Sequence, residues 1–357
     1  MTTKKITPLQ IATVFTGSFL GAGFLSGQEL LQFFGVFGLY GVAGMVLSIA
    51  AFCFFGLLVL RIAKRTGHTE FDRIIVPLDL PWLRSLVSGI FLFFLFDVMV
   101  AMIAGAGSLL QQVFGLPVAV GGALMTVLVL AVALMGAAGM LAAFNVVVPL
   151  LVAAAILISG AAFLLLPAGT IETRAFASGN PLLGNWFCSA VSYISYNMVA
   201  AISILVPLTA GIEDEKTIHK GLTLGAGSLT LIFVFILLPM ILYTALVGQA
   251  DLPMLDLAYR IGRIAGLIYA VLLFCGMFTS ALSGLFAITS RIQQKVPTLS
   301  LKRFIPFLCL LAFLFSLFGF KNMVAIVYPI CGYIGFFALL GVFLHYLSLK
   351  RQKTPVD

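Results

Sequence analysis

Charged residues are scarce in this chain of 357 residues. Lysine, arginine, aspartate and glutamate together make up 9% of it, whereas about a quarter of the residues in soluble domains are charged. This scarcity excludes an ordinary soluble domain. No Cys-x-x-Cys pair occurs among the five cysteines, which all lie in apolar segments: Cys53, Cys188, Cys275, Cys309 and Cys331. A disulfide framework and a structural zinc site are therefore not expected.

Motifs for catalysis and nucleotide binding are also missing. The three histidines, His68, His219 and His345, form no cluster, and the sequence has no Ser-His-Asp arrangement and no phosphate-binding glycine loop with a lysine. We therefore expect a protein that is not an enzyme and has no resident cofactor. The 20 basic residues exceed the 12 acidic ones, but they lie between apolar segments rather than along one helix. Nucleic acid is therefore not an expected partner.

Long apolar segments dominate what is present. Apolar residues make up 62% of the chain and its mean hydropathy is +1.19. Segments of about 20 apolar residues are long enough to cross a bilayer as helices. The sequence thus predicts an all-α polytopic membrane protein with the lipid bilayer as its surroundings. Its ten expected spans are 9–33, 36–61, 84–114, 118–137, 140–167, 184–211, 220–248, 263–291, 303–320 and 323–348.

The basic residues are distributed unevenly between the two sides that ten alternating spans define. Sixteen lysines and arginines fall on the side shared by both termini, and only Arg174, Arg260, Arg263 and Lys321 fall on the other. Cytoplasmic loops carry the excess of basic residues in membrane proteins. We therefore expect a multi-pass protein of the bacterial inner (cytoplasmic) membrane with cytoplasmic termini, and a cytoplasmic tail over 349–357.

Two connections between the spans are longer than turns. Residues 62–83 include the amphipathic run Phe71-Asp72-Arg73-Ile74-Ile75, which is typical of a short interfacial helix. Residues 249–262 indicate a helix that caps the external side and forms part of a lid. The alternative for both segments is a plain solvated loop.

The first span contains an unusual stretch, from Thr16 to Glu29. It holds four glycines, two serines and a Gln-Glu pair inside an otherwise apolar run. In a bilayer, interrupted backbone is tolerated only where it is buried in protein or lines a cavity, and secondary transporters hold solutes at such broken helices. The alternative is close helix packing through the Gly17–Gly21 and Gly23–Gly27 pairs.

Ten spans divide into five and five, and the second set is then inverted relative to the first, as in many secondary transporters. We expect repeats over residues 1–168 and 184–348. Span 6 should then be interrupted as span 1 is, and its centre carries hydroxyls and one amide, in Tyr193, Tyr196 and Asn197 among others. Polar contacts between helices are the alternative role for these side chains.

Two acidic side chains, Glu29 and Asp97, lie well inside predicted spans. Intramembrane carboxyl groups are costly and usually face a cavity or a partner. Asp97 lies halfway along span 3, where burial favours its neutral form, and it is a candidate for proton exchange, for binding a substrate amine or for a structural hydrogen bond. Glu29 is expected nearer the external end, as a gate, a cation-attracting group or a packing residue.

Span 8 contains the hydroxyl residues Thr279, Ser280 and Ser283, and Ser280 and Ser283 share one helical face. Hydroxyls together with carbonyls freed in a broken span 1 would make an oxygen cage that suits Na⁺. Taken alone, the hydroxyls are expected to bond back to their own helix.

These residues resemble those of the YkvI-like bacterial membrane proteins, divergent members of the amino acid-polyamine-cation superfamily with the leucine-transporter fold. The resemblance rests on Gly21 to Glu29, on Ser195-Tyr196-Asn197 and on Val206-Pro207-Leu208. It implies a Na⁺ site at Gly17, Leu20, Gly276, Thr279 and Ser280. It further implies that the backbone N–H groups around Gly21 to Gly23 take a substrate carboxylate. A second sodium site is not expected, because Phe24 stands where that fold uses an asparagine.

The sequence therefore predicts a cation-coupled secondary transporter of an amino acid or related zwitterion, working by alternating access. Spans 1, 2, 6 and 7 would rock against spans 3, 4, 8 and 9, with Na⁺ or H⁺ as the coupling ion and Asp97 and Glu29 as coupling residues. The alternatives are a small-molecule sensor resembling the membrane subunits of germinant receptors, and a structural membrane subunit. The expected substrate-binding residues are Gly21, Ala22, Gly23, Ser26, Gln28, Tyr193, Tyr196 and Asn197.

Overall fold

The computed structural model describes residues 6–351 apart from 69, 79, 136–139, 168–179 and 213, and describes only the backbone of 140–145. Within these residues every regular element is a helix. The elements are α1 (Pro8–Phe19), α2 (Ala22–Leu25), α3 (Gln28–Phe33), η1 (Gly35–Phe37), α4 (Leu39–Thr66), α5 (Phe71–Ile75), α6 (Pro81–Phe114), α7 (Val118–Met135), α8 (Met140–Leu165), η2 (Pro181–Leu183), α9 (Trp186–Leu205), η3 (Val206–Gly211), α10 (Glu215–Leu242), α11 (Thr244–Val247), α12 (Pro253–Ile261), α13 (Arg263–Lys295), α14 (Leu301–Ser316), α15 (Phe320–Asn322), η4 (Met323–Val327) and α16 (Tyr328–Arg351).

Eight helices in the described part of the chain are long and apolar enough to cross a membrane. The other two predicted spans differ from this group: 9–33 is interrupted and 303–320 corresponds to α14, which has 16 residues. The fold class is thus confirmed, and the count of ten spans stays a prediction. The turn expected at 136–139 and the tail at 352–357 lie outside the described residues.

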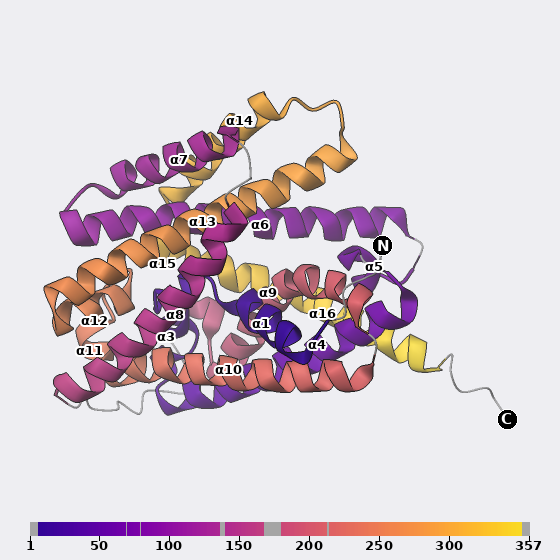
Figure 1. Cartoon of the computed structure of the whole chain (residues 1–357), viewed down its shortest axis with the longest axis horizontal. Coiled ribbons are helices and arrows are strands. Elements are labelled where there is room, and N and C mark those ends of the chain that lie inside the picture. The colour runs from indigo at the N-terminus through magenta and orange to yellow at the C-terminus, as the bar shows by residue number, and fades with distance from the viewer. Residues whose placement is uncertain are drawn as a thin grey trace.

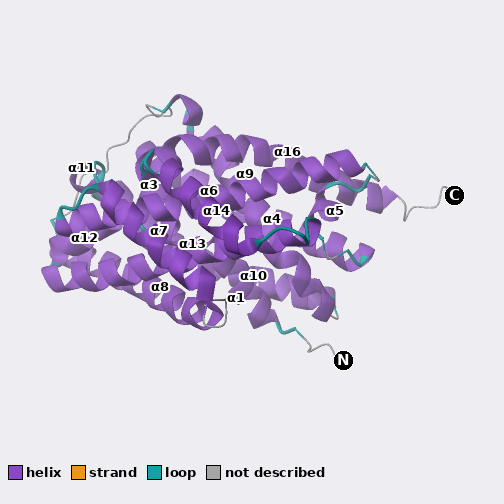
Figure 2. Ribbon diagram, turned by 90° about the horizontal axis from the view of Figure 1, so that it is seen from above, coloured by secondary structure: helices purple, strands orange, loops and turns teal. Residues whose placement is uncertain are grey.

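The bundle has two distinct ends. At the first, which we call the terminal end, Ile6 N–H donates to Gly211 O (2.9 Å) and Arg61 Nε pairs with Glu215 Oε1 (2.5 Å). At the opposite end, Ser108 Oγ donates to Asp251 Oδ2 (2.7 Å) beside α12. Figure 1 shows α11 and α12 on the left and α5 with the last turns of α16 on the right, and Figure 2 agrees.

Both long connections contain helices, as expected. The 62–83 connection forms α5 at the terminal end, where His345 Nδ1 lies 2.8 Å from Ile74 O. The 249–262 connection forms α12 at the opposite end. The location of α5 at a membrane surface stays a prediction.

Glycines allow the helices to approach closely. A Cβ added at Gly332 of α16 would lie 2.4 Å from Ser192 O of α9, and one at Gly335 would lie 2.9 Å from Ser195 O. A Cβ at Gly225 of α10 would lie 2.7 Å from a ring carbon of Phe15 in α1. Small residues bring helix backbones together in membrane proteins. These contacts hold α9 on α16 and α1 on α10.

The predicted break in span 6 is wrong. α9 is one helix from Trp186 to Leu205, and the 3₁₀ helix η3 follows it from Val206. Two of its polar side chains bond to carbonyls of their own helix, Asn197 Nδ2 to Tyr193 O (3.0 Å) and Ser195 Oγ to Val191 O (2.8 Å). Ser189 and Ser192 donate instead to carbonyls of other elements. No glycine interrupts α9, and its backbone keeps its helical bonds. The alternative, polar contacts between helices, holds for these two serines. The division into repeats over 1–168 and 184–348 stays a prediction.

We predict that Gly332→Ala lowers the thermal stability of the purified protein. The added methyl group would meet Ser192 O at 2.4 Å, and overpacking of this kind costs about 1–3 kcal/mol. Gly227→Ala in α10 is the matched control, because nothing lies within 4 Å of its added Cβ. Equal melting temperatures for the two variants would contradict close packing of α9 on α16.

Candidate functional site

Span 1 is broken at two points, as the glycine-rich stretch predicts. α1 ends at Phe19, Gly21 is extended (φ −96°, ψ 168°), and a single turn, α2, follows. Gly27 then takes a left-handed conformation (φ 83°) before α3 begins at Gln28. Residues other than glycine rarely adopt this conformation. The chain therefore changes direction twice between α1 and α3.

Neighbouring elements satisfy carbonyls that the breaks release. The Tyr269 hydroxyl of α13 donates to Leu25 O, and the Met254 N–H of α12 donates to Ser26 O at 2.9 Å. Ser189 Oγ of α9 donates to Phe33 O at 2.7 Å. Irregular backbone inside a bilayer requires such partners. Three separate helices thus stabilise the shape of span 1.

A cavity of about 460 Å³ lies beside the first break. Span 1, α6, α9, α13 and α16 contribute to its walls, and it extends from Glu29 and Gly23 to Arg291, near the terminal end of α13. On the other side of the break, α12 is bonded to Ser26. We call this the central cavity. The polar and charged side chains in its lining are Ser18, Glu29, Tyr196, Asn197, Ser203, Ser280, Ser283, Arg291 and Tyr328.

The side chain of Glu29 lies in the central cavity and is 7% exposed. Its Oε1 packs directly against Gly23, where an added Cβ would lie 2.2 Å from that oxygen. Glu29 has no hydrogen bond or ion pair to the part of the chain that the structure describes. Its expected location at the external edge is wrong, because the turn at Gly27 brings α3 back over α2.

The eight expected substrate-binding residues divide into two groups. Gly21, Gly23, Tyr196 and Asn197 line the central cavity, whereas Ala22, Ser26, Gln28 and Tyr193 do not. Tyr193 is instead enclosed by aromatic rings, with the Phe34 ring 4.9 Å away edge-on, and its hydroxyl has no partner among the described residues.

Asp97 is buried (2% exposed) but does not line the central cavity. Cys331 Sγ of α16 lies 4.0 Å from Asp97 Oδ2, and Oδ1 has no hydrogen-bond partner among the described residues. An unpaired buried carboxyl oxygen is unusual. Of the two buried carboxyl groups, that of Glu29 lines the central cavity and that of Asp97 does not.

The expected Na⁺ ligands are brought together in part. Gly17, Leu20 and Ser280 all line the central cavity. Thr279 Oγ1 donates to Cys275 O and Gly276 O (both 3.0 Å), which is the bonding expected for a hydroxyl on its own, although its oxygen can still accept or coordinate. Gly276 and Thr279 do not line the central cavity, so three of the five expected ligands face one cavity.

Two residues of the cavity, Tyr328 and Arg291, were not predicted from the sequence. The Tyr328 ring stacks on Tyr196 with centroids 4.4 Å apart. It follows the π-helical turn η4, and such turns are frequent at functional sites, but a single sequence gives no reliable signal for them. Arg291 stacks on Phe71 (4.2 Å) and Phe91 (4.7 Å) at the terminal end of the cavity.

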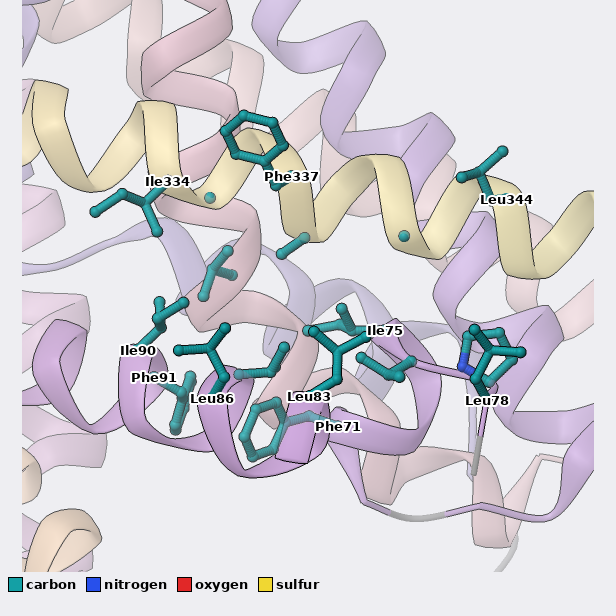
Figure 3. Close-up of a pocket in the computed structure, with 17 residues that line it drawn as sticks. Phe71, Ile75, Leu78, Leu83, Leu86, Ile90, Phe91, Ile334, Phe337 and Leu344 are labelled. Atoms are coloured by element: carbon teal, nitrogen blue, oxygen red, sulfur yellow. The ribbon is translucent and has the colours of Figure 1, made fainter. Parts of the chain in front are cut away.

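A second cavity, of about 360 Å³, lies between α6 and α16. Figure 3 shows Phe71, Leu83, Leu86, Ile90 and Phe91 on one side of it and Ile334, Phe337 and Leu344 on the other. Binding sites for polar solutes need a few placed polar groups, and the side chains that line this cavity are apolar. We therefore do not assign the solute to it.

No family model matches the chain. Two proteins of Bacillus subtilis (strain 168) are similar to it along almost its full length. The membrane protein YkvI is 29% identical over 353 residues, which is 99% of each chain, and YyaD is 26% identical over 339 residues, which is 94% of this chain and 95% of YyaD. The chain is thus a homologue of YkvI, as its motifs indicated.

Solved structures share the fold at low sequence identity. The inward-facing conformation of Mhp1 matches with a TM-score of 0.73 and 12% identity, over 99% of this chain and 79% of that one. A manganese transporter of Eremococcus coleocola, in complex with an aromatic bis-isothiourea substituted compound, matches with a TM-score of 0.56 and 13% identity, over 96% of this chain and 85% of that one. The leucine-transporter fold expected from the sequence is confirmed.

We predict that Tyr269→Phe destabilises the protein. The change leaves Leu25 O without its donor in a buried site, which costs about 1–3 kcal/mol. Tyr259→Phe is the matched control, because the Tyr259 hydroxyl has no hydrogen bond to the described residues. Thermal unfolding in detergent measures both, and a Tyr269→Phe variant as stable as wild type would show that the broken span 1 does not depend on this bond.

Proposed function

We propose that this homologue of YkvI uses its leucine-transporter fold as a cation-coupled secondary transporter of a small solute, an amino acid or a related zwitterion. One observation carries the proposal: an unpaired carboxyl group lines a cavity beside the broken span 1. Unpaired intramembrane carboxyl groups mark ion and substrate pathways.

We infer that the cavity opens to one side. Its lining reaches Ser203 and Arg291 near the terminal end, while at the opposite end Met254 of α12 is bonded to Ser26 and Asp251 to Ser108. Alternating access would require these contacts to open as the terminal end closes. With the excess of basic residues at the terminal end, the cavity would face the cytoplasm in this state. The likeness to an inward-facing structure supports this assignment.

Glu29 would link the solute to a proton. The resemblance places a substrate carboxylate at the N–H groups of Gly21 to Gly23, but Glu29 Oε1 packs against Gly23 in that position. An ionised Glu29 would repel a second carboxylate there, and a protonated Glu29 would not. Solute binding and protonation of Glu29 would therefore favour each other. Tyr196 and Asn197 would supply further hydrogen bonds from the cavity wall.

Sodium is the other candidate coupling ion. Leu20 and Gly17 would offer carbonyl oxygens, and Ser280 its hydroxyl, from opposite walls of the same cavity. Gly276 is near enough to α2 that an added Cβ would lie 3.4 Å from Ala22 Cβ, so this part of α13 lies close to the break. Thr279 would complete the set after rotation. Asp97, outside the cavity lining, stays a candidate only for holding a proton.

We predict saturable uptake of at least one amino acid into proteoliposomes when a Na⁺ or proton gradient is imposed. Glu29→Gln should lower proton-driven uptake about tenfold or more, a difference of about 1.4 kcal/mol, because glutamine resembles the protonated carboxyl group in size but cannot release a proton. Glu70→Gln is the matched control, because Glu70 pairs with Arg73 (2.8 Å) away from the cavity. Absence of uptake for every amino acid tested, or full uptake in Glu29→Gln, would contradict the proposal.

The two coupling ions are distinguished by a second variant. Thr279→Ala removes one predicted Na⁺ ligand and leaves Glu29 in place. If Na⁺ drives transport, we expect the Na⁺ concentration for half-maximal uptake to rise about tenfold in Thr279→Ala, with the pH dependence unchanged. If the proton drives it, uptake is independent of Na⁺ in both proteins, and the sodium assignment is wrong.

A further inference from the structure

A third cavity, of about 320 Å³, lies on the other side of α3 from the central cavity, at the end of the bundle opposite the chain termini. Unlike the second cavity, between α6 and α16, it has a polar lining. Gln28 and Gln32 come from α3, Thr244 from α11, Gln249 from the loop that follows, and Lys321 from α15. We call it the opposite-end pocket. None of the functions proposed above uses it.

The carboxamide of Gln28 is the least expected feature of this pocket. Gln28 is 1% exposed, and neither its Oε1 nor its Nε2 has a hydrogen-bond partner among the described residues. Buried polar groups are almost always hydrogen-bonded, so an unsatisfied amide in a polar cavity indicates that something else bonds to it. Both a donor and an acceptor are available there.

The charge of the pocket indicates the kind of ligand. Lys321 is half-buried and forms no ion pair with the part of the chain that the structure describes. The two acidic residues of the connection that contains α12 are engaged elsewhere: Asp251 accepts from Ser108 and Asp256 pairs with Arg260. The lining thus contains one ammonium group, three carboxamides and no carboxylate. Basic residues are rare at this end, which makes a lysine in a cavity there notable.

We propose that the opposite-end pocket binds the carboxylate group of a small solute, through the ammonium group of Lys321 and the amide N–H groups of Gln28 and Gln32. An ammonium group with converging amide donors suits an anionic oxygen acceptor. The statement that this solute is also the transported one rests on the proposed function. The binding itself does not.

The pocket also bears on the central cavity through α3. Gln28 and Glu29 are consecutive residues, yet Gln28 lines the opposite-end pocket and Glu29 lines the central cavity. A ligand held by Gln28 therefore acts on the same six-residue helix that places the Glu29 carboxyl against Gly23. Occupation of the opposite-end pocket would change where Glu29 lies.

The test is the thermal stability of the full-length protein in detergent with increasing sodium acetate, compared with sodium chloride and sodium methanesulfonate at equal ionic strength. We expect acetate to raise the melting temperature more than either control salt. In Lys321→Gln the acetate concentration for half-maximal protection should rise at least tenfold. Lys295→Gln, an exposed lysine at the terminal end, should behave as wild type.

Gln28→Met gives a second readout that a merely structural residue would not give. It removes an unsatisfied buried amide at nearly constant volume, so we expect a higher melting temperature without acetate and loss of the acetate effect. Acetate protection that equals the chloride effect, or that persists in Lys321→Gln, would overturn the proposal. Equal protection by all three salts that is lost in Lys321→Gln would indicate an inorganic-anion site and overturn the carboxylate assignment.

This experiment is separate from the uptake assay. Acetate protection without any solute uptake would refute the transport function and support the pocket. Solute uptake with no acetate effect would support the transport function and refute the carboxylate site in the opposite-end pocket.

Discussion

The structure depends on one constraint, that backbone N–H and C=O groups inside a bilayer need partners. The helical hydrogen bonding of span 1 is interrupted at Gly21 and at Gly27, and residues of other helices donate hydrogen bonds to its carbonyl groups. Tyr269 of α13 donates to Leu25 O and Met254 of α12 donates to Ser26 O. Ser189 of α9 donates to Phe33 O, at the end of α3. These bonds fix α2 and α3 against three helices, and the central cavity lies where the first break leaves space.

The same arrangement gives α3 two roles. Its first two residues lie on opposite sides, Glu29 toward the central cavity and Gln28 toward the opposite-end pocket. A short helix between a left-handed glycine and a 3₁₀ turn has few bonds of its own to resist reorientation. Under the proposed alternating access, movement of span 1 would break the Met254–Ser26 bond and move Glu29 and Gln28 together. Solute, proton and conformation would then be linked through one segment.

Much of the fold was predictable from sequence and part of the site was not. The apolar segments and the glycines of span 1 predicted the helices and the break, because backbone conformation follows from glycine content and local hydropathy. The direction of the side chains after the break cannot be predicted in this way, because it depends on the sign of φ at Gly27. Glu29 was therefore expected at the external edge, whereas its carboxyl group lines the central cavity and that of Asp97 does not. In span 6 polar side chains were interpreted as a break, but α9 is intact, and these side chains bond to carbonyls of α9 and of neighbouring elements.

The central claim, that the cavity beside span 1 opens to one side at a time, is tested most directly by cysteine accessibility in membranes. Ser203→Cys in the central cavity and Gln32→Cys in the opposite-end pocket would be made in a background without the five native cysteines. A membrane-impermeant maleimide should modify Ser203→Cys only from the side of the chain termini and Gln32→Cys only from the other, with both rates changing under a Na⁺ or proton gradient. Equal modification of Ser203→Cys from both sides, or rates unaffected by either gradient, would contradict the account.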